Sequence, residues 1–102
     1  MSKNKGFSST SAYRYSLALY ELAEEMKVLS QVEKNSSSFI NLINTSKDFN
    51  NLIKDPTINQ SILNNIVSKI SENFKLEKVF ENFLNFLILK RRFFYIKKIL
   101  TV

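Results

Sequence analysis

The chain offers few side chains that could do acid–base, nucleophilic or metal chemistry. It has no histidine and no cysteine, which removes the commonest general base, the commonest metal ligand and all thiolate chemistry. Its nine carboxylates are scattered, and none stands in a pattern typical of a catalytic pair. Gly6 is the only glycine, so a glycine-rich phosphate-binding loop is also missing. We therefore expect no catalytic residue, no metal and no cofactor, and we predict that the chain is not an enzyme.

The second chemical feature is a basic C-terminal end. Five basic residues come after the last acidic residue, Glu81, and they supply all but one unit of the net charge of +6: Lys90, Arg91, Arg92, Lys97 and Lys98. Such a cluster is typical either of the solvated face of a last helix or of a patch for nucleic acid or anionic lipid. The aromatic residues 93–95 interleave with the cluster, as stacking residues would. Both interpretations therefore stay open.

The stretch from Tyr13 to Glu25 predicts a helix, because it lacks glycine and proline and is rich in helix formers. At about 100° per residue, its apolar residues fall on two nearly opposite sides, with Tyr15, Ala18, Leu19, Leu22 and Met26 on one and Tyr13, Leu17 and Tyr20 on the other. Arg14, Glu21 and Glu25 share one narrow sector between them. A helix of this kind is either a central core helix or one that packs inward and also receives a partner.

Periodic apolar residues predict five further helices. We expect them at about residues 27–44, after the capping-box spacing of residues 45–48, and at residues 58–70, 76–90 and 93–102. Asp55-Pro56 should end the short third helix, and Thr57 should cap the fourth. The fourth helix carries a ladder of Ile58, Ile62, Ile66 and Ile70. Residues 71–75 are expected to form a polar link with Phe74 turned inward.

The expected fold is all-α, a six-helix bundle without strands. One glycine and one proline supply too few turn residues for an all-β protein. We divide the chain into a flexible lead, residues 1–11, and one helical domain, residues 12–102. The fifth helix is more apolar than one core contact requires, but it is interrupted by polar residues and too short to span a bilayer. We therefore expect no direct insertion into a membrane.

Four short motifs, in order and spacing, resemble the delta subunit of F-type ATP synthases, known in mitochondria as the oligomycin-sensitivity-conferring protein. The family pattern Tyr-Ala-x-Ala-Leu-Phe-x-Leu-Ala is matched by residues 15–23 with two mild changes, Ser16 for alanine and Tyr20 for phenylalanine. Pro-x-Ile is matched by residues 56–58, and Asn-Phe-Leu-x-x-Leu by residues 82–87. An arginine follows at Arg92, and then the apolar Ile96 and Ile99. Arg91 stands where the family usually has glycine, so the turn there is expected to differ in detail.

The resemblance implies a six-helix domain on top of the catalytic head of a proton-translocating ATP synthase. In the family, this domain binds amphipathic N-terminal helices of the alpha subunits and so ties the head to the peripheral stalk. A second half, which joins the stalk b subunit, is expected to be absent here. The implied location is peripheral, on the cytoplasmic face of a bacterial inner membrane or the matrix face in a mitochondrion.

One alpha-subunit helix is implied to bind between the first and fifth helices. On this chain, that groove would be lined by Tyr15, Ala18, Leu22, Val79, Phe83 and Phe86. Ala18 is small enough to let an incoming helix approach closely, with larger apolar residues on either side. The same six residues could instead be ordinary core. Two further alternatives are a small basic helical domain that binds nucleic acid and a structural bundle without a specific partner.

Overall fold

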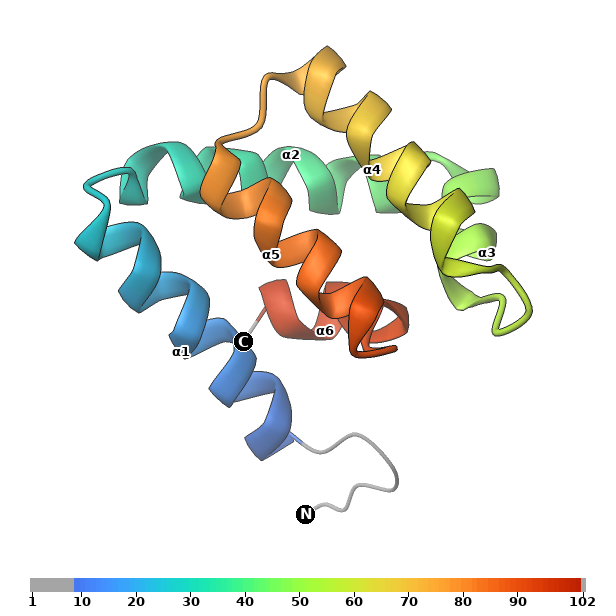
Figure 1. Cartoon of the computed structure of the whole chain (residues 1–102), viewed down its shortest axis with the longest axis horizontal. Helices are drawn as coiled ribbons and strands as arrows, with labels where there is room; N and C mark the ends of the chain where they lie inside the picture. Colours follow the sequence, from blue (N-terminus) through green and yellow to red (C-terminus); the bar gives the residue numbers. More distant parts are fainter. Residues whose placement is uncertain (1–8, 102) are drawn as a thin grey trace.

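The computed structural model describes residues 9–101, and these form helices joined by short turns (Figure 1). The elements are α1 (Ser9–Glu25), α2 (Leu29–Thr45), α3 (Lys47–Lys54), α4 (Gln60–Phe74), α5 (Lys78–Leu89), the 3-10 turn η1 (Phe93–Tyr95) and α6 (Ile96–Leu100). There is no strand among the described residues, and the expected all-α fold with six helices is confirmed. α1 begins inside the lead expected at residues 1–11, while residues 1–8 lie outside the described residues.

The helices α1 and α5 run side by side in opposite directions on the face seen in Figure 1, and α2 crosses behind α5. α1 also packs against α2 and α6, and α4 packs against α5. No described helix is long and apolar enough to cross a membrane. The arrangement leaves one long edge of α1 facing one long edge of α5 at the surface.

A cluster of aromatic rings around Phe39 forms the centre of the core. The ring of Phe39 on α2 meets Phe49 of α3 at 5.6 Å, Phe80 of α5 at 5.9 Å and Phe93 of η1 at 6.3 Å between centroids. All three contacts are edge-to-face, the arrangement that aromatic quadrupoles favour. The ring of Phe39 on α2 thus contacts rings from three other elements.

Two helix caps differ from those expected. Ser46, rather than Thr45, caps α3 by accepting a 3.2 Å hydrogen bond from the Phe49 amide. The cap of α4 is Asn59, whose side chain accepts from the Ile62 amide at 2.9 Å. Thr57, the expected cap, instead donates its amide and hydroxyl to Asp55 Oδ1 at 2.9 and 2.6 Å. The Asp55 carboxylate therefore holds Thr57 in a turn, and the helix begins later.

The expected isoleucine ladder is only partly buried. Ile58 precedes α4, Ile62 is exposed, and the fully buried residue of this helix is Val67. Residues four apart rotate by about 40° on a helix of 3.6 residues per turn. A row of such residues therefore drifts out of the interface, and only its middle can face the core.

The polar link expected at residues 71–75 is also wrong, because α4 continues through Phe74. Phe74 is exposed rather than turned inward, whereas Ser71 is buried. The Ser71 hydroxyl donates to Glu81 Oε1 of α5 at 2.9 Å. This bond satisfies a buried polar side chain at the α4–α5 contact. Ser71 therefore lies within the packed part of α4 rather than in a link. The helix ends at Phe74, and the following residue, Lys75, takes the left-handed conformation with φ 53°.

The turn after α5 contains a left-handed residue of the kind that glycine usually supplies, but here that residue is an arginine. Arg91 has φ 59°, in the left-handed region that a residue with a Cβ occupies at a cost. The Arg92 amide donates to Leu87 O at 2.7 Å and the Arg91 amide to Ile88 O at 3.0 Å. These bonds satisfy carbonyls at the end of α5, as in a helix that ends on a left-handed residue. The strain at Arg91 is therefore offset by a well-paired helix end.

Candidate docking groove

The helix α1 is not a central core helix. Its buried strip is narrow and consists of Ala12, Leu19 and Ala23. Apolar residues flank this strip on both sides and remain exposed, including Leu22 on one side and Tyr13, Leu17 and Tyr20 on the other. The small alanines let α1 approach its neighbours closely, so larger side chains beside them stay at the surface. The interpretation of α1 as a central core helix is therefore wrong.

A groove lies between α1 and α5. Its middle is a hollow of about 360 Å³ lined by Tyr15, Ala18, Leu19, Leu22, Asn82, Phe83 and Phe86. Ala18 is exposed, and Phe86 is 44% exposed at the opposite wall. Phe83 is buried and forms the base on the α5 side. The groove is thus apolar and open to solvent.

The groove continues toward the N-terminus of α1. A second hollow of about 370 Å³ shares Tyr15, Ala18 and Phe86 with the first and adds Ser11 and Arg14. The rings of Tyr15 and Phe86 stand 6.4 Å apart between centroids where the two hollows meet. Because three residues border both, the two hollows form one surface along the edges of both helices.

Five of the six residues expected to line the groove border these hollows. The exception is Val79, which is half-buried against the core and lines neither hollow. Sequence reasoning missed Leu19 at the base and Asn82, Ser11 and Arg14 along the sides. Arg14 lies four residues before Ala18, so helical spacing could have placed it beside the groove.

The charged side chains beside the groove are cationic near the C-terminal end of α5. Lys90 places its Nζ 5.7 Å from the centroid of the Phe86 ring, within the range of a cation–π contact. Arg14 is exposed beside Tyr15. Among the described residues, no group of His, Cys, Asp or Glu side chains could hold a metal ion. The groove is suited to non-covalent contact with an amphipathic helix.

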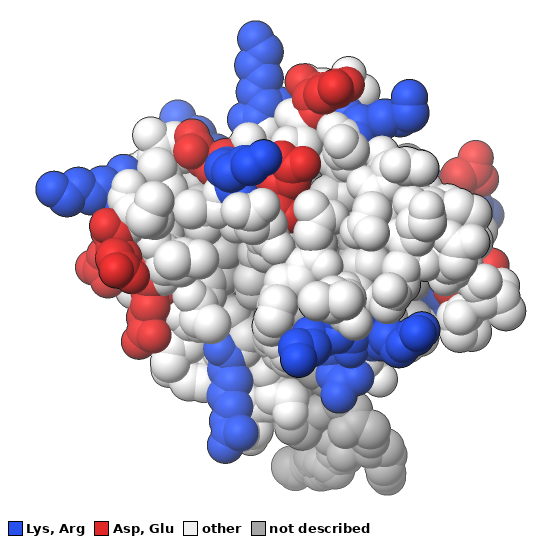
Figure 2. All heavy atoms as spheres, viewed as in Figure 1, with Lys and Arg blue, Asp and Glu red and all other residues white. Residues whose placement is uncertain are grey.

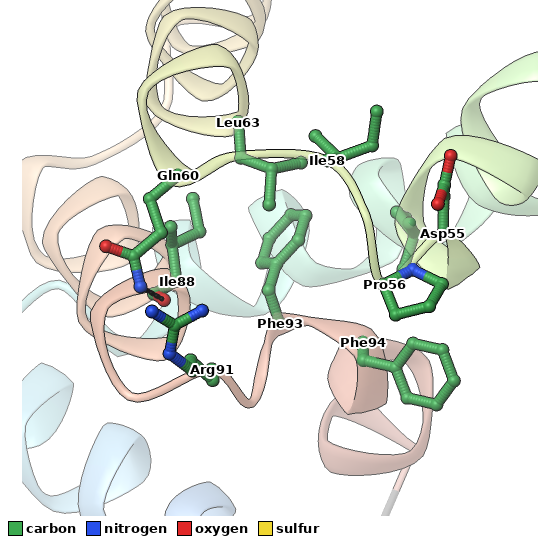
Figure 3. Close-up of a pocket in the computed structure, with 10 residues that line it drawn as sticks. Asp55, Pro56, Ile58, Gln60, Leu63, Ile88, Arg91, Phe93 and Phe94 are labelled. Carbon is green, nitrogen blue, oxygen red and sulfur yellow. Dashed lines mark hydrogen bonds between the residues drawn. The ribbon is translucent and has the colours of Figure 1, made fainter.

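A separate hollow of about 280 Å³ lies where the α3–α4 loop meets the end of α5 and η1 (Figure 3). Gln60, at the start of α4, donates from Nε2 to the carbonyl of Ile88 on α5 at 3.1 Å. The side chain of Phe93 fills the middle of this region, and Phe94 lies toward Pro56 at its edge (Figure 3). The bond from Gln60 ties two helix ends together, so this hollow belongs to the packing of the loops.

The pKa of Asp55 lies below its ordinary value of 3.8, first because the Thr57 hydroxyl donates to the carboxylate and then because the Thr57 amide does so. Both hydrogen bonds favour the charged form of the carboxylate. Asp55 lines the loop hollow rather than the groove between α1 and α5. The shift therefore concerns the α3–α4 turn and supplies no acid or base to the groove.

A sequence model of the ATP synthase delta (OSCP) subunit family matches residues 12–102. The chain is 62% identical over 100 residues to the ATP synthase subunit delta of Pelagibacter ubique, covering 98% of this chain and 54% of that protein. It is 30% identical over 101 residues to the subunit delta of Jannaschia, covering 99% of this chain and 54% of that protein.

The chain spans about half the length of these curated relatives. No solved structure matches the chain. The matched region begins at Ala12 within α1 and includes all of the later helices, so it contains both walls of the groove. The chain therefore belongs to the ATP synthase delta (OSCP) subunit family.

Proposed function

We propose that this chain is a non-catalytic part of the peripheral stalk of an F-type ATP synthase. It binds amphipathic N-terminal helices of alpha subunits at the top of the catalytic head, one of them in the groove between α1 and α5. The observation that carries the proposal is the exposed apolar surface of that groove, where Leu22 and Phe86 are 43% and 44% exposed. Exposed apolar surface of this kind marks a docking site for a helix.

The mechanism is mechanical. The docked helix covers apolar side chains of both walls, and their removal from water holds the catalytic head to this domain. The matched region covers 54% of the Pelagibacter protein, and we propose that the remaining part of such a longer chain joins the b subunit of the stalk. Together the two halves would keep the head from turning with the rotor, at the cytoplasmic face of a bacterial inner membrane or the matrix face in a mitochondrion.

The nucleic-acid alternative is disfavoured by the positions of its aromatic residues. Phe93 is buried in the core, and Tyr95 is half-buried. Phe94 is exposed, but its ring stands edge-on to Tyr95 at 5.2 Å between centroids. A stacking platform needs several accessible ring faces, and here Phe94 alone offers one. We therefore propose no nucleic-acid partner, and the position of Lys90 is better explained by its contact with Phe86 beside the groove.

A titration of the chain with the N-terminal peptide of the alpha subunit from the same organism tests the proposal. Phe86→Ala should weaken peptide binding by about 1–3 kcal/mol, as truncation of an aromatic interface anchor does. Phe94→Ala, a matched exposed phenylalanine outside the groove, should leave the affinity unchanged. A single-stranded oligonucleotide serves as control. Submicromolar oligonucleotide binding at physiological salt, or equal effects of the two phenylalanine variants, would contradict the proposal.

A further inference from the structure

One end of the groove between α1 and α5 is cationic on both walls. Arg14 lines the hollow on the α1 side, and the Lys90 ammonium sits over Phe86 on the α5 side. Tyr15 and Phe86, which adjoin these cations, face each other across the groove at 6.4 Å. Figure 2 shows Lys and Arg side chains on both sides of the lower part of this face. An acidic side chain placed there would meet two cations from different helices.

Acidic residues of α1 lie near the other end of the groove, although they line neither of its hollows. Glu21 and Glu25 are exposed and share with Arg14 the sector of α1 that adjoins Ala18. Glu25 lies eleven residues after Arg14, about 16 Å along the axis at 1.5 Å per residue. Figure 2 shows acidic side chains over this end of α1. Lys78 begins α5 at the same end and offsets part of the negative charge, so the cationic end is the stronger feature.

We propose that this groove fixes the direction of the helix it binds. The occupant is an amphipathic alpha-subunit helix with an apolar stripe about three turns long and with its carboxylates gathered at one end. Those carboxylates lie against Arg14 and Lys90, and the neutral or basic end lies beside Glu21 and Glu25. This inference rests on the proposed function, to which it adds the charge pattern and the direction of the partner.

The physical reason is that apolar contacts alone do not select a direction. A stripe of apolar side chains can fill the groove in either direction with similar buried area, because burial is non-directional. Charges at the two ends remove this equivalence, since the reversed helix would place like charges together. Arg14 and Lys90 therefore act on specificity and association rate more than on the total affinity.

The charge contribution can be measured with the alpha-subunit peptide and a double variant, Arg14→Glu with Lys90→Glu. At low salt the double variant should bind the peptide about tenfold more weakly, since each exposed ion pair contributes up to roughly fivefold. The difference should shrink in 1 M salt, where the Debye length is about 3 Å. Lys34→Glu combined with Lys69→Glu makes the same charge change on α2 and α4 and should leave binding unchanged.

The direction is measured by NMR with a nitroxide on the end of the peptide nearer its carboxylates. We expect the label to broaden the amide signals of Ser11 and Arg14 far more than those of Glu25 and Met26. The inference would be overturned by stronger broadening at the Glu25 end, by equal broadening at both ends, or by unchanged affinity of the double variant. Each of these results would leave the proposed function standing. If the peptide fails to bind the unmodified chain, the proposed function falls and this inference with it.

Discussion

Replacing Ala18 by aspartate distinguishes a docking groove from an ordinary core contact. Ala18 is exposed on α1, between Tyr15 and Leu22. Aspartate at an exposed helix position loses at most about 0.7 kcal/mol of helix propensity relative to alanine. A typical domain is stable by about 5–15 kcal/mol. Ala18→Asp should therefore leave a cooperative melt close to that of the unmodified chain.

Binding of the alpha-subunit peptide should respond very differently. The new carboxylate would lie in an apolar groove and would lose its water when the helix docks. The effective penalty for burying an ion is several kcal/mol, and an exposed i, i+4 pair with Arg14 would offset at most about 1 kcal/mol of it. Each 1.4 kcal/mol that remains lowers affinity tenfold. We therefore expect a loss of at least about a hundredfold, measured by isothermal titration calorimetry with the peptide.

Two matched variants complete the test. Ala23 lies on the same helix but is fully buried, so Ala23→Asp should destabilise the fold by several kcal/mol and abolish the cooperative melt. Tyr13 lies on the other apolar side of α1 and is exposed, so Tyr13→Asp should change neither folding nor binding. The reasoning is refuted if folded Ala18→Asp binds the peptide with unchanged affinity. It is equally refuted if that variant loses its cooperative melt.

Three further predictions concern the fold. Phe39→Ala should lower the free energy of unfolding by about 3–5 kcal/mol in a urea titration, because it empties the centre of the aromatic core; a loss below about 1 kcal/mol would contradict this. Arg91→Gly should raise that free energy by up to about 1 kcal/mol by relieving the left-handed φ of 59°, whereas Arg92→Gly, at φ −115°, should lower it. Thr57→Val should raise the pKa of Asp55 toward 3.8 in an NMR titration of its carboxyl carbon. Because the folded-state pKa is lowered, the stabilisation by this turn is present above pH 3.8 and is lost as the pH falls through the folded-state pKa; an unchanged pKa in the variant would show that the hydroxyl is not its cause.

The helices were predictable because their apolar residues recur with the helical period. The fold class and the short α3, with Phe49 and Ile53 inward, follow from that period and from the break at Asp55-Pro56. The caps were less predictable, because Thr45, Ser46, Thr57 and Asn59 are all capable of capping. Which one does so depends on competing hydrogen bonds, such as the one from Thr57 to Asp55.

The groove between the first and fifth helices was expected from the family resemblance. The residues alone indicated only that both helices carry more apolar surface than one core contact requires. Val79 was placed in the groove because it shares a seam with Phe83 and Phe86, but it packs against the core instead. Helical spacing gives the direction in which a side chain points. It does not give how closely the neighbouring helix packs at that position, because only the tertiary packing sets that distance. Binding of a helix in the groove stays a prediction.

The distribution of residue sizes on α1 explains how one short helix can serve both the core and a partner. Buried positions on this helix are mainly alanine, at Ala12 and Ala23, so the inner strip contributes little apolar area by itself. The consequence is that the backbone of α1 comes close to its neighbours, which leaves the exposed Leu22 beside the contact rather than within it. If Ala12 or Ala23 were large, α1 would be pushed outward and the groove with α5 would change its width. The small residues of the inner strip therefore shape the docking surface even though they do not line it.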